Sequence, residues 1–168
     1  MALKFIKRLS RHLFICPNAV KCHFPEESMR RIEAAIASTE SIHLGEIRFA
    51  VESHLHVFDI FRKKTSKNRA MEVFSQLHIW DTAHNNGVLI YLLLADRDFE
   101  ILADRGIHQY VGGAGWEKIC QQMEVMFRQG QFEAGVLYGI SKIGERLAHH
   151  YPASGENVNE LPNAPVIL

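Results

Sequence analysis

Cysteine is scarce in this sequence, and neither sign of charge is in excess. The three cysteines, Cys16, Cys22 and Cys120, form no CxxC pair and have no spacing typical of a zinc site. Small secreted domains that depend on disulfides carry many more cysteines, so we expect free thiols and a cytoplasmic protein. The 19 basic residues balance the 19 acidic ones. The composition therefore does not favour a nucleic acid as the partner.

Long apolar runs are also missing. No stretch is apolar for long enough to predict a transmembrane segment, and the start MALKFIKRLSRHLF lacks the continuous apolar core of a signal peptide. This start predicts a short basic amphipathic helix instead. Its apolar residues on one helical stripe are Leu3, Ile6, Leu9, Leu13 and Phe14. We favour a helix that packs on the domain, and the alternative is a peripheral membrane or protein partner bound through residues 1–14.

A chain of 168 residues has the usual size of one domain with one hydrophobic core. We divide it into an N-terminal helix and linker (residues 1–24), an α/β domain (residues 25–152) and a flexible, polar C-terminal tail (residues 153–168). Within the domain, helical spacing of apolar residues after Pro25 predicts a helix to about Thr39. Residues 46–52 alternate between polar and apolar, which predicts a half-buried strand.

The middle of the sequence predicts a hairpin between helices. The uninterrupted apolar run GVLIYLLLA at residues 87–95 predicts a central strand that is covered on both faces. Asp96, Arg97 and Asp98 predict a tight turn with solvated side chains, and residues 99–104 predict a shorter strand. Further helices are expected at about residues 66–77, after the glycines of residues 112–115, and over residues 132–150. This order of elements predicts an α/β fold with a short sheet covered by helices.

Residues 70–152 also resemble a known family. The strand entry NNGVLIYL, the strand exit EILADRGI and the tryptophan-containing segment GGAGWEKICQQMEVMFRQGQF are similar to those of the TPM domain family, and GEIRFAVE at residues 45–52 extends the likeness. The resemblance implies a three-layer α/β/α sandwich with a short mixed central sheet. Members of the family have been described as acid phosphatases or as binders of calcium or magnesium, and many have no assigned activity.

Polar residues are predicted to meet at one edge of the sheet. If the helix at residues 66–77 is a crossover, the strands at residues 46–52 and 87–95 are parallel and begin at the same edge. A two-residue turn at Asp96 and Arg97 would place Asp104 opposite Leu89, so that the third strand ends at this edge. The residues brought together would be Asp81, Asn86 and Asp104, with Glu46, Asn85 and Arg105 close by.

Carboxylate and amide oxygens suit a hard cation, so we predict a Ca²⁺ or Mg²⁺ site at Asp81, Asn86 and Asp104. The function expected from it is that of a cation-binding or accessory module. One alternative is a weak metal-dependent phosphatase at the same edge, although no P-loop or evident covalent nucleophile is present. Another is a non-enzymatic scaffold. Each residue also has a structural explanation, with Asp104 closing a strand, Asn86 forming a turn and Asp81 acting as a cap.

Overall fold

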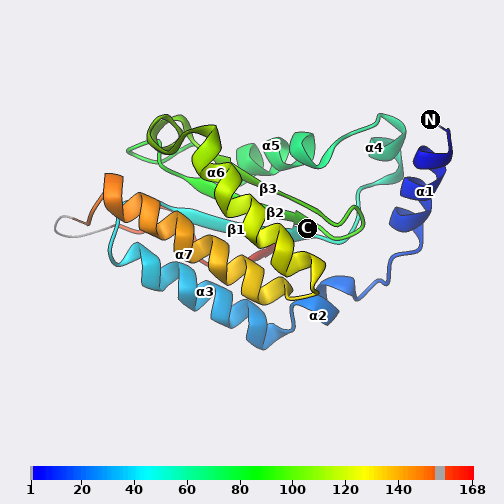
Figure 1. Cartoon of the computed structure of the whole chain (residues 1–168), viewed down its shortest axis with the longest axis horizontal. Coiled ribbons are helices and arrows are strands. Elements are labelled where there is room, and N and C mark those ends of the chain that lie inside the picture. Colours follow the sequence, from blue (N-terminus) through cyan, green and yellow to red (C-terminus); the bar gives the residue numbers. More distant parts are fainter. Residues whose placement is uncertain (1, 154–157) are drawn as a thin grey trace.

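The chain folds into three layers, with helices on both faces of a four-stranded mixed sheet (Figure 1). The computed structural model describes residues 2–153 and 158–168. The strands are β1 (Ile47–Glu52), β2 (Val88–Leu93), β3 (Asp98–Ala103) and β4 (Val166–Ile167), and they lie in the order β3-β2-β1-β4. The predicted α/β/α sandwich with a short mixed sheet is therefore confirmed.

Strand pairing follows the predicted crossover and hairpin, with one change of register. β1 pairs in parallel with β2, and β2 pairs in antiparallel with β3. Leu89 lies opposite Leu102 and not opposite Asp104, because residues 94–97 form a longer connection than the predicted two-residue turn. Since side chains alternate between faces with a period of two, the change of two residues leaves each side chain on its predicted face.

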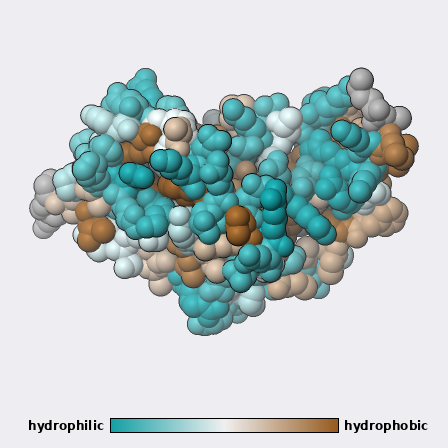
Figure 2. Space-filling model, viewed as in Figure 1, coloured by the Kyte–Doolittle hydropathy of each residue, from teal (hydrophilic) through white to brown (hydrophobic). Residues whose placement is uncertain are grey.

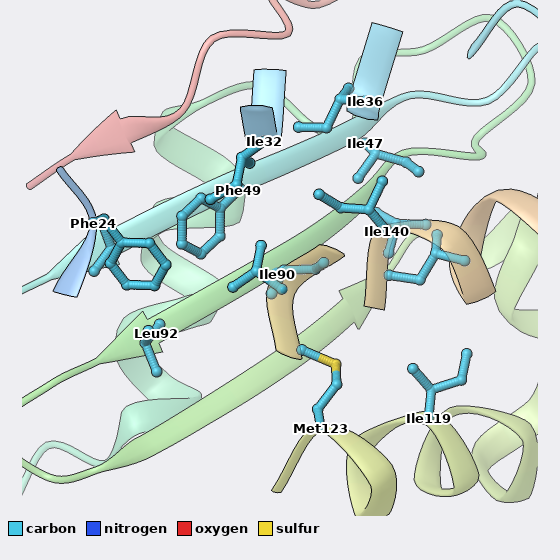
Figure 3. Close-up of a cluster of buried hydrophobic side chains, with 14 of the residues drawn as sticks. Phe24, Ile32, Ile36, Ile47, Phe49, Ile90, Leu92, Ile119, Met123 and Ile140 are labelled. Atoms are coloured by element: carbon cyan, nitrogen blue, oxygen red, sulfur yellow. The ribbon is translucent and has the colours of Figure 1, made fainter. Parts of the chain in front are cut away.

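Three helices cover one face of the sheet, namely α3 (Glu26–Glu40), α6 (Arg105–Arg128) and α7 (Phe132–His150). Figure 3 shows the core between them and the sheet, where Phe49 of β1 and Ile90 of β2 lie near Ile140 of α7 and Met123 of α6. All four side chains are buried. Burial of one such side chain stabilises the folded state by about 1.5–3 kcal/mol, so this core contributes much of the stability.

The opposite face is covered by α5 (Ser66–Gln76), with α4 (Val57–Phe61) and α1 (Ala2–Leu13) at one end. Ala70 and Val73 of α5 pack with Leu89 and Tyr91 of β2 in a second core. Both faces of β1 and β2 are consequently buried along their whole length. The prediction that β1 is only half-buried is wrong, because its alternating polar residues lie beneath other parts of the chain.

The glycine-rich segment lies at a kink within α6. It precedes the helical part that contains Trp116, as predicted, and a further helical part comes before it. α6 begins at Arg105, where the Asp104 carboxylate accepts a hydrogen bond from the Arg105 N–H at 2.7 Å. The backbone leaves the helical conformation at Gly112, whose φ is +66°. Glycine adopts such a φ at little cost, so Gly112 allows a kink between two helical parts of one element.

The N-terminal helix packs on the domain, as we favoured. Phe5 and Leu9 of α1 lie against the second core, and the Phe5 and Phe61 ring centroids are 5.5 Å apart. The remainder of the predicted apolar stripe points away from the domain, since Leu3 and Ile6 are exposed. α2 (Ala19–His23) then leads into α3. In the part of the chain that the structure describes, no helix combines the length and apolar character needed to cross a bilayer.

An ion-pair cluster on Asp96, which we call the Asp96 cluster, fixes α1 to the β2–β3 connection. Arg8 Nη2 lies 2.7 Å from Asp96 Oδ2, and His12 Nε2 lies 3.1 Å from Asp96 Oδ1. His12 Nδ1 accepts a hydrogen bond from the Leu55 N–H, so Nε2 carries the proton that faces the carboxylate. The prediction of a solvated Asp96 is wrong, because α1 covers it.

Part of the predicted C-terminal tail is also ordered. Residues 154–157 lie outside the described residues, but residues 158–168 run along the sheet and include β4. Val166 and Ile167 pair in parallel with Ala50 and Val51 of β1, and Leu161 is buried in the second core. The expectation of a wholly flexible tail over residues 153–168 is therefore wrong for this part.

Candidate functional site

Two of the three predicted cation ligands lie at one edge of the sheet, which we call the polar edge. It is formed where β1 and β2 begin and where β3 ends. The Asp104 N–H donates to the Gly87 carbonyl at 2.9 Å, so Asp104 is directly across from the residue that follows Asn86. The hairpin and the crossover therefore bring Asn86 and Asp104 to neighbouring strands, as predicted.

Asn86 is fully buried and fixes the loop before β2. Its backbone N–H donates to the Thr82 hydroxyl at 3.1 Å, and its side-chain Nδ2 donates to the Leu44 carbonyl at 3.0 Å. Its Oδ1 is buried and has no hydrogen-bond partner among the described residues. Because most buried polar atoms are hydrogen-bonded, this oxygen is a candidate ligand.

Asp104 is the N-cap of α6. One carboxylate oxygen, Oδ1, accepts from the Arg105 N–H, which satisfies a donor that the first turn of a helix leaves open. The other oxygen, Oδ2, is buried and has no hydrogen-bond partner in residues 2–153 and 158–168. Asp104 thus follows β3 and caps α6, and its second oxygen, Oδ2, is a candidate ligand.

The third predicted ligand, Asp81, is exposed, and its backbone N–H donates to the His78 carbonyl. Glu46 is buried, but the N–H groups of Glu160 and Leu161 already occupy its carboxylate at 3.0 and 3.2 Å. Among the described residues, no three His, Cys, Asp or Glu side chains are close enough together to hold a metal ion. The structure therefore brings the backbones of Asn86 and Asp104 to neighbouring positions, and it forms no cluster of three such ligands in the part of the chain it describes.

A group of buried ionisable residues lies beside this edge, and sequence reasoning places only one of them, Glu46, near it. The members are Glu40, His43, Glu46 and Arg48. Burial raises the pKa of Glu40 to about 7, although its Oε1 accepts from the Ile47 N–H at 3.0 Å. Burial also lowers the pKa of His43 to about 4, so this imidazole is neutral at pH 7. Its Nδ1 accepts from the Gly45 N–H.

Arg48 gives this group a buried positive charge. Burial lowers the pKa of the guanidinium, while the carboxylates of Glu40 and Glu46 oppose that change. Arg48 Nε and Nη1 have no hydrogen-bond partner among the described residues. The cluster holds no cysteine or serine that could act as a nucleophile. Its clearest role is to fix the C-terminal segment over β1 through Glu46.

A second buried network lies at the other end of β1. Arg69 of α5 donates to both carboxylate oxygens of Glu52, at 2.8 and 3.2 Å, and the Tyr91 hydroxyl donates to Glu52 at 2.7 Å. Burial raises the pKa of the Tyr91 hydroxyl, and the neighbouring Glu52 charge adds to the effect. Because each partner is satisfied, this network explains why a polar residue of β1 can be buried.

A cavity of about 410 Å³ lies away from both polar groups, between the β2–β3 connection and the turn from α6 to α7. Its walls include Phe99, Phe127 and Phe132, with Arg97 and Arg128 among its polar residues. It contains none of the predicted cation ligands.

One family model matches most of the chain. The family model of the TPM domain matches residues 23–146. The chain therefore belongs to the TPM domain family, and α1 and the C-terminal segment lie outside the matched residues.

Two solved structures have folds similar to that of this chain. The chain is similar to the BA42 protein from the psychrophilic bacterium Bizionia argentinensis, with 33% sequence identity, a TM-score of 0.75, and coverage of 84% of this chain and 93% of that chain. It shares the fold of the N-terminal domain of a protein from P. gingivalis, with 17% identity, a TM-score of 0.57, and coverage of 77% and 82%. Comparison with curated proteins finds no match.

Proposed function

We propose that the polar edge binds a hard divalent cation, Ca²⁺ or Mg²⁺, and that this chain is a cytoplasmic cation-binding or accessory module of the TPM type. The observation that carries the proposal is that two buried oxygens, Asn86 Oδ1 and Asp104 Oδ2, have no hydrogen-bond partner among the described residues. Amide and carboxylate oxygens are preferred ligands of both ions, and a bound cation would satisfy these atoms. Asp81, which is exposed in the connection before Asn86, would complete the set.

The proposed site is a weak one. It has two carboxylates, those of Asp81 and Asp104, and one oxygen of Asp104 already accepts the hydrogen bond that caps α6. Affinity for calcium rises with the number of charged ligands, and only two are present here, so we expect a dissociation constant on the order of 10⁻⁴–10⁻³ M. Water would fill the remaining coordination positions, more so for Mg²⁺, which loses its hydration shell reluctantly.

Amide NMR of the full chain, titrated with CaCl₂ and with MgCl₂, tests this proposal. We expect saturable shifts at the amides of Asn86, Gly87 and Gly106. Asp104→Asn should remove them without loss of the fold, because Asn is also a good N-cap. Asp98→Asn, at the opposite end of β3, is the matched control and should titrate as the parent does. Shifts that are absent, or that survive in Asp104→Asn, would refute the site.

The phosphatase alternative uses the same edge and depends on the same cation. A bound cation would lower the pKa of a water molecule and so supply the nucleophile that the polar edge lacks. Cation-dependent release of phosphate from a generic ester, lost in Asp104→Asn, is the result this alternative requires. If the titration finds no cation, the alternative is also refuted.

A second candidate function is peripheral attachment to a membrane or a protein through residues 1–14. It is favoured by the exposure of Leu3, Ile6 and Leu13 on a helix that the rest of the domain holds in place. Deletion of residues 1–14 should abolish such attachment. Retained attachment in the shortened chain would exclude this role.

A further inference from the structure

Large apolar side chains are exposed together at the end of the molecule that α1 and α4 form. Six of them, each more than half exposed, are Leu3, Ile6, Leu13, Phe14, Phe58 and Phe61. In Figure 2 brown side chains lie at the right-hand end, where Figure 1 places α1. Exposed apolar patches on soluble domains mark binding surfaces, so this end requires a partner.

α1 presents three different faces around its axis, since successive residues are rotated by about 100°. One face packs on the domain through Phe5 and Leu9. The other two are exposed and adjoin each other, one apolar with Leu3, Ile6 and Leu13, the other basic with Lys4, Lys7 and Arg11. A helix with adjoining apolar and basic faces is suited to lie in the interface of a lipid bilayer.

Acids balance only part of the positive charge of this end, because Asp96 pairs with Arg8 and Arg11 and leaves Lys4 and Lys7 exposed. Residues 3–14 contain no Asp or Glu. In α4, Asp59 is already paired with Lys64 at 2.8 Å, and the following Arg62 and Lys63 are exposed. α4 therefore continues both properties of α1, because it adds exposed phenylalanines and unbalanced cations.

We propose that α1 and α4 together form one docking surface for an anionic lipid bilayer. The inference rests on the attachment role proposed above for residues 1–14, and it adds the partner and the contribution of α4. The Asp96 cluster holds α1 against the domain, so the apolar and basic faces are presented in a fixed orientation. No large rearrangement is needed for Leu3, Ile6 and Phe61 to reach the acyl boundary while Lys4 and Lys7 meet the headgroups.

The composition of the surface favours lipid over a protein partner. Lysine is depleted in protein–protein interfaces, whereas the cations here include Lys4, Lys7 and Lys63. Anionic lipid attracts each Lys or Arg near the surface by about 1 kcal/mol, which is about fivefold in binding. Two lysines therefore account for about a thirty-fold difference in affinity for membranes that carry negative charge.

Flotation of the full chain with lipid vesicles tests the inference. One vesicle contains phosphatidylcholine alone, and the other contains about one-third phosphatidylglycerol as a source of negative charge. We expect the parent chain to bind the anionic vesicle. Its affinity for that vesicle should fall about thirty-fold in Lys4→Ala/Lys7→Ala and by a comparable or larger factor in Leu3→Ser/Ile6→Ser. The matched control is Lys118→Ala/Arg146→Ala, which removes two exposed cations from α6 and α7 and should bind as the parent does.

The outcomes separate this inference from the attachment role. If the parent chain binds both vesicles equally and Leu3→Ser/Ile6→Ser abolishes that binding, the result supports the attachment role and overturns the specificity for anionic lipid. Binding to neither vesicle would overturn the lipid inference, and an attachment role would then require a protein partner. Phe61→Ser tests α4 separately, and unchanged binding would remove α4 from the surface. Thermal unfolding of each variant, measured by circular dichroism, verifies that the domain remains folded.

Discussion

The attachment of α1 to the domain depends on one carboxylate, and Asp96→Asn tests that dependence. In the Asp96 cluster, Arg8 donates to both oxygens of Asp96, while Arg11 Nη2 lies 3.4 Å away and His12 Nε2 lies 3.1 Å away. Asn keeps the size of the side chain but removes its charge. Three basic side chains would then face a neutral amide.

The magnitude follows from burial and from the pKa of Asp96. Removal of one partner from a fully buried ion pair costs about 3–5 kcal/mol. Arg8 retains 21% of its side-chain exposure and Asp96 retains 11%, so water compensates part of this loss. Burial alone would raise the pKa of Asp96, but hydrogen bonds from His12 and Arg8 lower it to about 2. We therefore expect a loss of about 2 kcal/mol at pH 7.

The same pKa determines the dependence on pH. Because the pKa of Asp96 is lower in the folded chain than the 3.8 of an unperturbed Asp, its contribution is complete above about pH 4 and disappears as the pH falls toward 2. Asp96→Asn should lack this acid-dependent component. Urea denaturation at pH 7 and at pH 3 measures both effects.

Limited proteolysis shows whether α1 is released before the domain unfolds. We expect faster cleavage within residues 14–18 of Asp96→Asn, since loss of the Asp96 cluster weakens the docking of α1. Asp98→Asn, at the first residue of β3, is the control. A double-mutant cycle with Arg8→Met should give a coupling energy above about 1 kcal/mol. A free energy of unfolding within about 0.5 kcal/mol of the parent, together with unchanged cleavage, would refute the reasoning.

Two further predictions concern the polar edge. Glu40→Gln should stabilise the fold by about 2–3 kcal/mol at pH 8 and less near pH 5, because a carboxyl whose pKa rises from 4.5 to about 7 on folding costs stability that grows as the pH rises between these two values and is constant above them. Urea denaturation at the two pH values measures the effect, and equal effects would contradict the assignment. Gly106→Ala should cost about 1–3 kcal/mol, since a Cβ there would lie 2.4 Å from the backbone oxygens of His84 and Asn85. Gly113→Ala, which has open space around it, should be neutral or slightly stabilising, and a similar loss in both glycine variants would show that packing on Gly106 is not the cause.

Elements with a long periodic or apolar pattern could be predicted closely from the sequence. The expected helix over residues 132–150 matches α7 (Phe132–His150), and the apolar run at residues 87–95 contains β2. β4 could not be predicted in this way, because two residues carry no periodicity. Its pairing with β1 depends on residues more than a hundred positions apart.

Polar residues were the least predictable part of the fold and of the site. The meeting of Asn86 and Asp104 followed from the crossover and the hairpin, so topology alone was sufficient there. The burial of Glu46 and Glu52 was not predictable from their alternation with apolar residues, since their partners come from the C-terminal segment and from α5. Asp96 shows the same limitation, because Arg8 lies 88 residues away in the sequence.

The fourth strand protects a part of the sheet that would otherwise be open to other molecules. β1 is apolar at Ala50 and Val51, and β4 occupies the backbone groups on its outer side. A chain cut back to the family-matched residues 23–146 would leave that side of β1 without its neighbour. Open strand edges pair with strands from other chains, so the shortened protein should self-associate. The C-terminal residues that form β4 therefore protect the folded chain against aggregation.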